Sequence, residues 1–261
     1  MGVVEMEVQD GVALITLNRP DRLNAWTLEM EHDYFGLLKD CGRSAQVRAI
    51  VVTGAGRGFC AGADMRDLQA LGDGDIDPHE RAEARLSQAT ALSVPKPVIA
   101  AINGAAAGLG LVQALMCDVR FAAQGAKLTT AFARRGLVAE HGISWLLPRL
   151  IGPARALDLL LSARVVLAEE ALELGLVNRV LAPAALLEAT MDYAQVLASS
   201  CSPASMASIK RQVYADMERG LDDAIATADE LMLASFSGAD FVEGVTSFTE
   251  RRDPRFEALA V

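Results

Sequence analysis

The sequence predicts an α/β fold with parallel strands, followed by a helical C-terminal section. Short apolar runs alternate with stretches of helical spacing, which is the pattern of strand–helix–strand connections. From Pro183 onward the pattern is nearly all helical. The expected C-terminal helices cover about 184–199, 203–216, 220–234 and 238–250. We therefore expect an α/β core over 1–182 and a helical region over 183–261.

The N-terminal part predicts a hairpin and a capped helix. Residues 3–17 form two alternating runs broken at Asp10-Gly11, a strong hairpin turn signal. Proline-containing residues 18–21 predict a loop. Thr27 is a suitable N-cap for a helix that extends to about Cys41.

The middle of the chain predicts buried strands and one long helix. Residues 49–52 are an apolar run that ends in a glycine-rich loop, and a helix is expected over 64–71. Polar residues 72–78 predict a surface loop. A helix over 78–93 follows, with proline in its first turn.

Residues 97–117 are 21 residues without a charge, long enough to span a bilayer. The segment nevertheless contains Asn103-Gly104, Gln113 and mostly small side chains. We therefore expect a buried strand over 98–102, a turn, a buried helix from about 109 and a further strand over 119–122, with no membrane partner.

Composition and charge limit the function. The 261 residues carry a formal charge of −10 and no run rich in Lys or Arg, so nucleic acid is not an expected partner. The four cysteines lack metal-ligand spacing, which predicts free thiols in a reducing compartment and no metal site. With no secretory signal, the expected location is cytoplasmic. These cysteines are Cys41, Cys60, Cys117 and Cys201.

The glycine-rich segment 53–60 superficially resembles the nucleotide loop of short-chain dehydrogenases. Cys60 stands where the last glycine is expected, and no Tyr-x-x-x-Lys occurs in the chain. No Gly-Lys-Ser/Thr follows either, so a phosphate-binding P-loop is excluded. A dinucleotide enzyme is therefore disfavoured.

Two loops share a position that suits acyl chemistry. Residues 54–63 and 103–108 each follow an apolar strand and precede a helix. Small residues there let backbone N–H groups approach a ligand, and two such amides on one oxygen make an oxyanion hole. The spacing equally fits two tight packing turns, so both interpretations stay open here.

An ordered set of motifs is similar to the crotonase (enoyl-CoA hydratase/isomerase) superfamily over nearly the whole chain. The motifs are Asn18-Arg19-Pro20 with Asn24-Ala25, the segments 59–65, 101–104, 117–118, 136–138, 147–152 and 171–180, and the tail 243–252.

This resemblance implies a spiral of ββα units with a helical C-terminal trimerisation region, assembled as a trimer or dimer of trimers. It also implies that the amides of Ala63 and Leu109 bind the thioester oxygen of an acyl-CoA. The coenzyme is then expected along Arg22, Leu23, Ala25, Ala61, Asp64 and Met65. Tail residues that reach a neighbouring subunit's ligand would be Phe236, Phe248 and Arg251, although each equally fits helix packing or a solvated charge.

The two glutamates that activate water in hydratases of the family would fall at Val112 and at or near Arg134, and neither is acidic. Between 97 and 157 the only acids are Asp118 and Glu140. Asp118 reads as a structural cap or a partner of Arg120. Glu140 lies where the resemblance puts the single catalytic glutamate of enoyl-CoA isomerases.

A lone carboxylate favours moving a proton between C2 and C4 over adding water. We expect burial to raise the pKa of Glu140. His141 could tune or replace Glu140, but an exposed turn histidine is the expected outcome. Phe132 and Trp145 are expected to shape the acyl tunnel or core. Alternatives are hydration or dehydration by Glu140 alone, a catalytically silent acyl-CoA-binding relative, and thioester hydrolysis or dehalogenation by a nucleophilic carboxylate.

Overall fold

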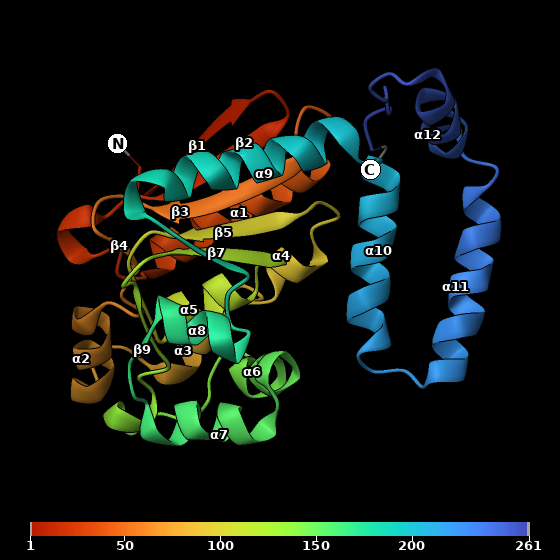
Figure 1. Cartoon of the computed structure of the whole chain (residues 1–261). Helices are drawn as coiled ribbons and strands as arrows, with labels where there is room; N and C mark the ends of the chain where they lie inside the picture. The colour runs from red at the N-terminus through yellow and green to blue at the C-terminus, as the bar shows by residue number, and fades with distance from the viewer. Residues whose placement is uncertain (1, 260–261) are drawn as a thin grey trace.

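A computed structural model describes residues 2–259 as an α/β body with a helical arm (Figure 1). The strands are β1 Val4–Gln9, β2 Val12–Leu17, β3 Ala49–Gly54, β4 Gly58–Cys60, β5 Val98–Ile102, β6 Ala105–Ala107, β7 Val119–Ala123, β8 Lys127–Thr129, β9 Val166–Leu167 and β10 Arg179–Leu181. The helices are α1 Leu28–Arg43, α2 Met65–Asp73, α3 Pro78–Glu83, α4 Thr90–Ser93, α5 Leu109–Leu115, α6 Ile143–Ile151, α7 Pro153–Ser162, α8 Ala168–Leu174, α9 Leu186–Ser200, α10 Pro203–Asp216, α11 Leu221–Ser235 and α12 Ala239–Glu250. Short 3-10 turns cover Pro20–Arg22, Ala133–Arg135 and Pro183–Ala185.

Two sheets carry the core. The larger sheet has the order β1-β2-β3-β5-β7-β10, and all its pairings are parallel except the β1–β2 hairpin. The smaller sheet has the order β4-β6-β8-β9. The predicted parallel α/β fold and the N-terminal hairpin are confirmed.

The two sheets arise from a repeated ββα unit. In each unit one strand joins the large sheet, the next joins the small sheet, and a helix follows: β3-β4-α2, β5-β6-α5 and β7-β8-α6. Equivalent strands of successive units pair in parallel, so the chain advances as a spiral. The spiral expected from the resemblance is confirmed.

Thr27 caps α1 as predicted, its hydroxyl accepting a hydrogen bond from the amide of Met30 at 3.2 Å. The predicted helix over 78–93 is wrong, because α3 and α4 are separated by residues 84–89. A tertiary contact accounts for the break: the buried carboxylate of Glu31 accepts a hydrogen bond from the amide of Leu86 at 2.9 Å. Leu86 is therefore held by a residue of α1 and not by a helix of its own segment.

The uncharged segment 97–117 lies in the interior as β5, β6 and α5. All of β5 and all of α5 are buried. Within residues 2–259, no helix combines the length and the apolar character that a bilayer span requires.

Asp118 is structural, as expected, but Arg120 is not its partner. Its carboxylate accepts hydrogen bonds from the amide of Val98 and the hydroxyl of Tyr214, both at 2.8 Å, and lies 2.7 Å from the Nζ of Lys210. Arg120 donates to backbone carbonyls instead. Asp118 therefore ties α10 to the large sheet.

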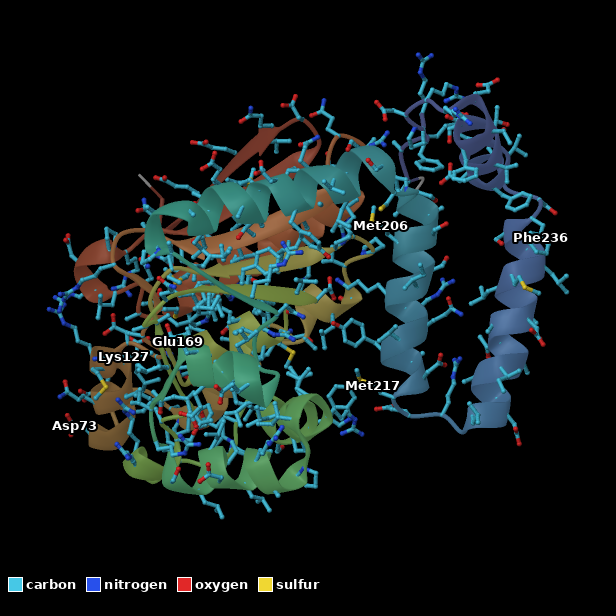
Figure 2. All side chains as sticks on the ribbon, in the orientation of Figure 1. Asp73, Lys127, Glu169, Met206, Met217 and Phe236 are labelled. Atoms are coloured by element: carbon cyan, nitrogen blue, oxygen red, sulfur yellow. The ribbon has the colours of Figure 1, made fainter. Side chains whose placement is uncertain are left out.

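The C-terminal helices divide between the body and an arm. Helix α9 packs on the large sheet, where it contacts β2, β3, β5 and β7. Helices α10, α11 and α12 form an arm that stands beside the α/β body (Figure 1). Figure 2 shows Phe236 directly after the end of α11, with α10 between it and the body. All four helices lie within about two residues of their predicted bounds.

Asn24 ties the loop that follows β2 to the first glycine loop, residues 54–63. Its amide nitrogen donates to the carbonyls of Ala55, Gly58 and Phe59 at 2.9–3.1 Å, and its oxygen accepts from the amide of Arg19 at 2.8 Å. The side chain is fully buried, so these backbone groups depend on it.

We predict that Asn24→Ala lowers the free energy of unfolding by about 3 kcal/mol, because it leaves buried carbonyls without a donor. Urea denaturation measures the change. Asn18→Ala, at a partly exposed asparagine, serves as the control and should cost less than about 1 kcal/mol. Equal losses from both variants would contradict the role assigned to Asn24.

Candidate functional site

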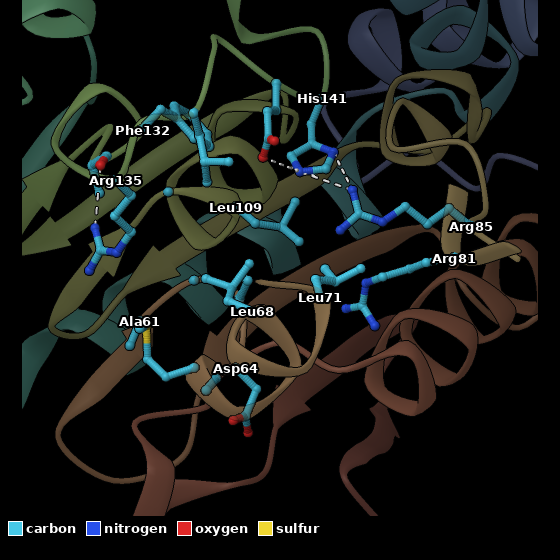
Figure 3. Close-up of a pocket in the computed structure, with 18 of the residues that line it drawn as sticks. Ala61, Asp64, Leu68, Leu71, Arg81, Arg85, Leu109, Phe132, Arg135 and His141 are labelled. Atoms are coloured by element: carbon cyan, nitrogen blue, oxygen red, sulfur yellow. Dashed lines mark hydrogen bonds and ion pairs between the residues drawn. The ribbon is translucent and has the colours of Figure 1, made fainter. Parts of the chain in front are cut away.

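A cavity of about 470 Å³ lies between the first glycine loop, α2, α3 and the loop before α6. Its size suits a small-molecule ligand. Figure 3 shows its wall, with Leu68, Leu71 and Leu109 facing the interior and several charged side chains around them. The lining residues are Arg22, Ala25, Ala61–Met65, Leu68, Leu71, Pro78, Arg81, Ala82, Arg85, Gly108, Leu109, Ala131, Phe132, Arg135, Leu137, Glu140 and His141.

Both predicted oxyanion amides belong to residues on this wall. Ala63 follows β4, and Leu109 is the first residue of α5. Trp26 pairs with the backbone on either side of Ala63, donating to the carbonyl of Gly62 and accepting from the amide of Asp64. Across the described residues, neither the amide of Ala63 nor that of Leu109 donates a hydrogen bond to the protein. Both N–H groups are thus available to a ligand.

Glycine is required where the two loops meet. Gly62 has φ +93°, and a β-carbon there would lie 2.7 Å from the carbonyl oxygen of Ala107 and 3.7 Å from the amide nitrogen of Leu109. A β-carbon on Gly110 would overlap the carbonyl oxygen of Cys60. The loops therefore pack backbone against backbone, which brings Ala63 close to Leu109.

Glu140 forms a chain of contacts with two further residues (Figure 3). Its Oε2 lies 3.3 Å from Nε2 of His141. The Nη1 of Arg85 lies 3.1 Å from Nδ1 and 3.2 Å from Nε2 of the same ring. Because arginine only donates, it must face an unprotonated nitrogen; with Nε2 donating to Glu140, that nitrogen is Nδ1.

The environment of Glu140 corrects two expectations. The hydrogen bond from His141 lowers the pKa of Glu140, outweighing burial, and the positive charge of Arg85 acts in the same direction. The expectation of a raised pKa is therefore wrong, since His141 supplies a donor to the carboxylate. His141 is not exposed either: its side chain is 7% accessible, against 32% for Glu140.

Asp64 lines the cavity, but protein groups engage its carboxylate. It accepts a hydrogen bond from the amide of Arg66 at 3.1 Å, as the N-cap of α2, and pairs with Arg19 at 2.9 Å. Burial acts to raise the pKa of Asp64, but these two contacts outweigh it and the pKa is lowered. Among residues 2–259, Asp64 and Glu140 are the two carboxylates on the wall.

The positions expected for hydratase glutamates do not line this cavity. Val112 is buried within α5, and the exposed Arg134 donates from Nε to the carbonyl of Ser162. Phe132 lines the cavity, as expected for a residue that shapes the tunnel. Trp145 does not line the cavity but packs against the hydrophobic core, the other role expected for it, and the guanidinium of Arg149 lies 4.1 Å from its ring centre.

Most of the other predicted ligand contacts also meet here, namely Arg22, Ala25, Ala61 and Met65. Leu23 is not on the wall; its carbonyl accepts from the amide of Ala61 at 2.9 Å and so holds the loop. The tail residues Phe236, Phe248 and Arg251 lie on α11 and at the end of α12, outside this cavity.

Sequence reasoning missed Arg81, Arg85 and Arg135, whereas the contact of His141 with Glu140 matches the alternative in which His141 tunes this carboxylate. Spacing offered one usable signal, because Arg81 and Arg85 are four residues apart, the separation that puts side chains on one helix face.

Burial raises the pKa of the Cys60 and Cys117 thiols to about 12 each, so neither is a nucleophile here. The described part of the chain contains no His/Cys/Asp/Glu cluster able to hold a metal ion.

Comparison with known proteins identifies the family. The family described as "Enoyl-CoA hydratase/isomerase" matches residues 7–258. The chain belongs to the enoyl-CoA hydratase/isomerase family. It is 36% identical over 266 residues to 1,2-epoxyphenylacetyl-CoA isomerase of Escherichia coli K12, covering 98% of each chain. It is 38% identical to a probable enoyl-CoA hydratase of Rhodobacter capsulatus, covering 97% of each.

Solved structures of the enoyl-CoA hydratase/isomerase family confirm the fold. A probable enoyl-CoA hydratase/isomerase from Mycobacterium abscessus superposes with a TM-score of 0.90 at 30% identity, covering 98% of this chain and 99% of its own. An enoyl-CoA hydratase from Mycobacterium marinum is 50% identical, with a TM-score of 0.72, and covers 84% of this chain and 100% of its own. The family's relatives include both isomerases and hydratases by name.

We predict that His141→Ala raises the pKa of Glu140, because burial then acts without the opposing hydrogen bond. The carboxylate, ionised above its lowered pKa in the parent protein, should take up its proton at higher pH in the variant. NMR titration of isotope-labelled glutamate carboxyls measures the shift. His79→Ala, at an exposed histidine, is the control, and an unchanged Glu140 titration in His141→Ala would refute the assignment.

Proposed function

We propose that the enzyme isomerises the double bond of an enoyl-CoA, with Glu140 as the single proton carrier and the amides of Ala63 and Leu109 binding the thioester oxygen. One observation carries the proposal: Glu140 is the cavity carboxylate that retains a free oxygen. His141 engages Oε2, and within residues 2–259 no side-chain or amide donor engages Oε1. Asp64 is occupied by Arg19 and Arg66.

The chemistry requires one base and one stabilised anion. Ionised Glu140 removes a proton from C2 or C4, and the electron pair moves toward the thioester carbonyl to give a dienolate. Two N–H donors on that oxygen stabilise the negative charge where it develops. Glu140, now protonated, returns the proton to the other carbon, so the bond moves and the carboxylate is regenerated.

The coenzyme is proposed to lie along Arg22, Ala25 and Ala61–Met65, which support this placement by lining the cavity beside the oxyanion amides. A guanidinium such as Arg22 suits the phosphates of the coenzyme. No separate cofactor is needed, because the acyl-CoA is itself the substrate. The buried free thiols support a reducing, cytoplasmic location.

Hydration of the double bond by Glu140 alone is the second candidate. It is favoured by the relatives, several of which carry the name enoyl-CoA hydratase. Against it, Val112 and Arg134 offer no second carboxylate to orient a water molecule.

We predict that Glu140→Gln lowers kcat for isomerisation of a non-conjugated enoyl-CoA by about 10³-fold or more, because the amide cannot accept the proton. The same variant should lose deuterium exchange at C2 while still binding the thioester. Glu173→Gln, at an exposed glutamate outside the cavity, is the matched control and should keep the parent kcat. Full activity in Glu140→Gln would refute the proposal, and hydration without isomerisation by the parent enzyme would select the second candidate.

We further propose that the arm mediates self-association into a trimer or a dimer of trimers. A groove of about 780 Å³ between α10, α11 and α12 supports this, together with large apolar side chains exposed on the arm. Phe248 is 85% accessible, which is costly in water for an unassembled chain. Phe236 and Arg251 lie on the same arm.

We predict that the double variant Val245→Asp/Phe248→Asp shifts the protein to monomers, because charges replace apolar contacts at an interface. Sedimentation velocity measures the assembly state. Thr249→Asp adds a charge to an exposed position of the same helix and should leave the assembly intact. A parent protein that sediments as a monomer would contradict the proposal.

A further inference from the structure

One wall of the cavity carries two arginines that the proposed proton shuttle does not use directly. Arg81 and Arg85 come from α3 and the residues just after it, and both line the cavity. In Figure 3 they lie on one side of Leu68 and Leu109, while Ala61 and Arg135 lie on the other side. If the coenzyme follows Arg22 and Ala61–Met65, as the proposed function requires, this wall faces the acyl group.

Arg81 is buried with few partners. Its side chain is 8% accessible, its Nη2 lies 3.1 Å from Oδ2 of Asp67, and its Nε is buried without a hydrogen-bond partner among the described residues. A guanidinium carries five N–H donors, and withholding them from water costs free energy unless acceptors replace the water. Asp67 therefore accepts from only one nitrogen of the buried Arg81 guanidinium, and Nε is left without an acceptor among the described residues.

Arg85 extends the same donor surface toward the proposed base. Its Nη1 contacts the His141 ring, and no carboxylate lies within 4.0 Å of its guanidinium among residues 2–259. The surrounding wall is apolar, formed by Leu68, Leu71 and Ala82. A plain alkyl chain would contact these side chains but would offer no acceptor to either arginine.

We infer that the acyl group carries an acceptor oxygen, as a carbonyl or carboxylate, at the end remote from the thioester, and that Arg81 selects for it. The charges on this wall are already balanced, since Asp67 offsets Arg81 and Glu140 offsets Arg85. A neutral carbonyl and a carboxylate therefore share the required chemistry, which is acceptance of N–H bonds from a guanidinium.

The test is calorimetric binding to the parent protein, because these saturated ligands have no double bond for the enzyme to move and Glu140 continues to offset Arg85. The ligands are hexanoyl-CoA, adipoyl-CoA, the methyl ester of adipoyl-CoA and free coenzyme A. We expect one or both oxygenated thioesters to bind about tenfold more tightly than hexanoyl-CoA, the gain typical of a hydrogen bond to a charged group. Comparing the acid with its ester separates a carboxylate from a neutral carbonyl.

Arg81→Met removes the donors but keeps an unbranched stem, and it should abolish this preference while leaving the affinity for hexanoyl-CoA and free coenzyme A unchanged. Asp67→Asn breaks the ion pair with α2 but keeps the donors, so it should retain the preference. Arg135→Met, on the other side of the cavity, should also retain it.

If the parent protein binds hexanoyl-CoA and both oxygenated ligands with equal affinity, the inference is overturned. So would an Arg81→Met variant that weakens free coenzyme A as much as the thioesters, because Arg81 would then act on the coenzyme or the fold. Failure of the isomerase proposal is a separate outcome, since it appears in turnover by the parent enzyme and not in these affinities.

Discussion

The close approach of two backbone segments is the constraint on which the site depends. Gly62 and Gly110 let the loop after β3 and the start of α5 pack with no β-carbon between them. Because the equivalent strands of successive units pair in parallel, the same spiral register that builds the two sheets also brings these loops together. The fold thus positions two N–H groups through backbone geometry alone, and the side chain of Leu109 remains free to shape the cavity.

The ionisation state of Glu140 is set by neighbouring side chains more than by its burial. A partly buried carboxylate can avoid the cost of its charge by taking a proton or by accepting a hydrogen bond. Here His141 supplies the bond and Arg85 fixes the tautomer that makes it possible. A base held in the ionised state is weak, so the proposed mechanism depends on anion stabilisation at the two amides to make the substrate proton acidic enough.

The sequence predicted those features that local chemistry determines. Thr27, the Asp10-Gly11 turn and the buried strands follow from caps, turn residues and apolar runs. Position between strand and helix marked the two glycine loops as possible amide sites, whereas the individual residues Ala63 and Leu109 came from the family resemblance. The break after α3 could not be predicted, because it depends on Glu31 reaching an amide 55 residues away. The lowered pKa of Glu140 was missed although its main cause, His141, is the next residue, because the sequence does not show whether a side chain in a turn faces its neighbour or solvent.

Backbone packing and side-chain contacts hold different parts of the same cavity. The glycine loops, fixed by backbone packing, would hold the thioester in the same way for any acyl group. The segment from α2 to α4 is anchored by side chains instead, through Glu31 at Leu86 and Asp67 at Arg81. Side-chain anchors can be exchanged without disturbing the strand register. In the proposed mechanism, selection of the acyl group therefore falls to the wall formed by α2 and α3, and enolate stabilisation falls to the loops.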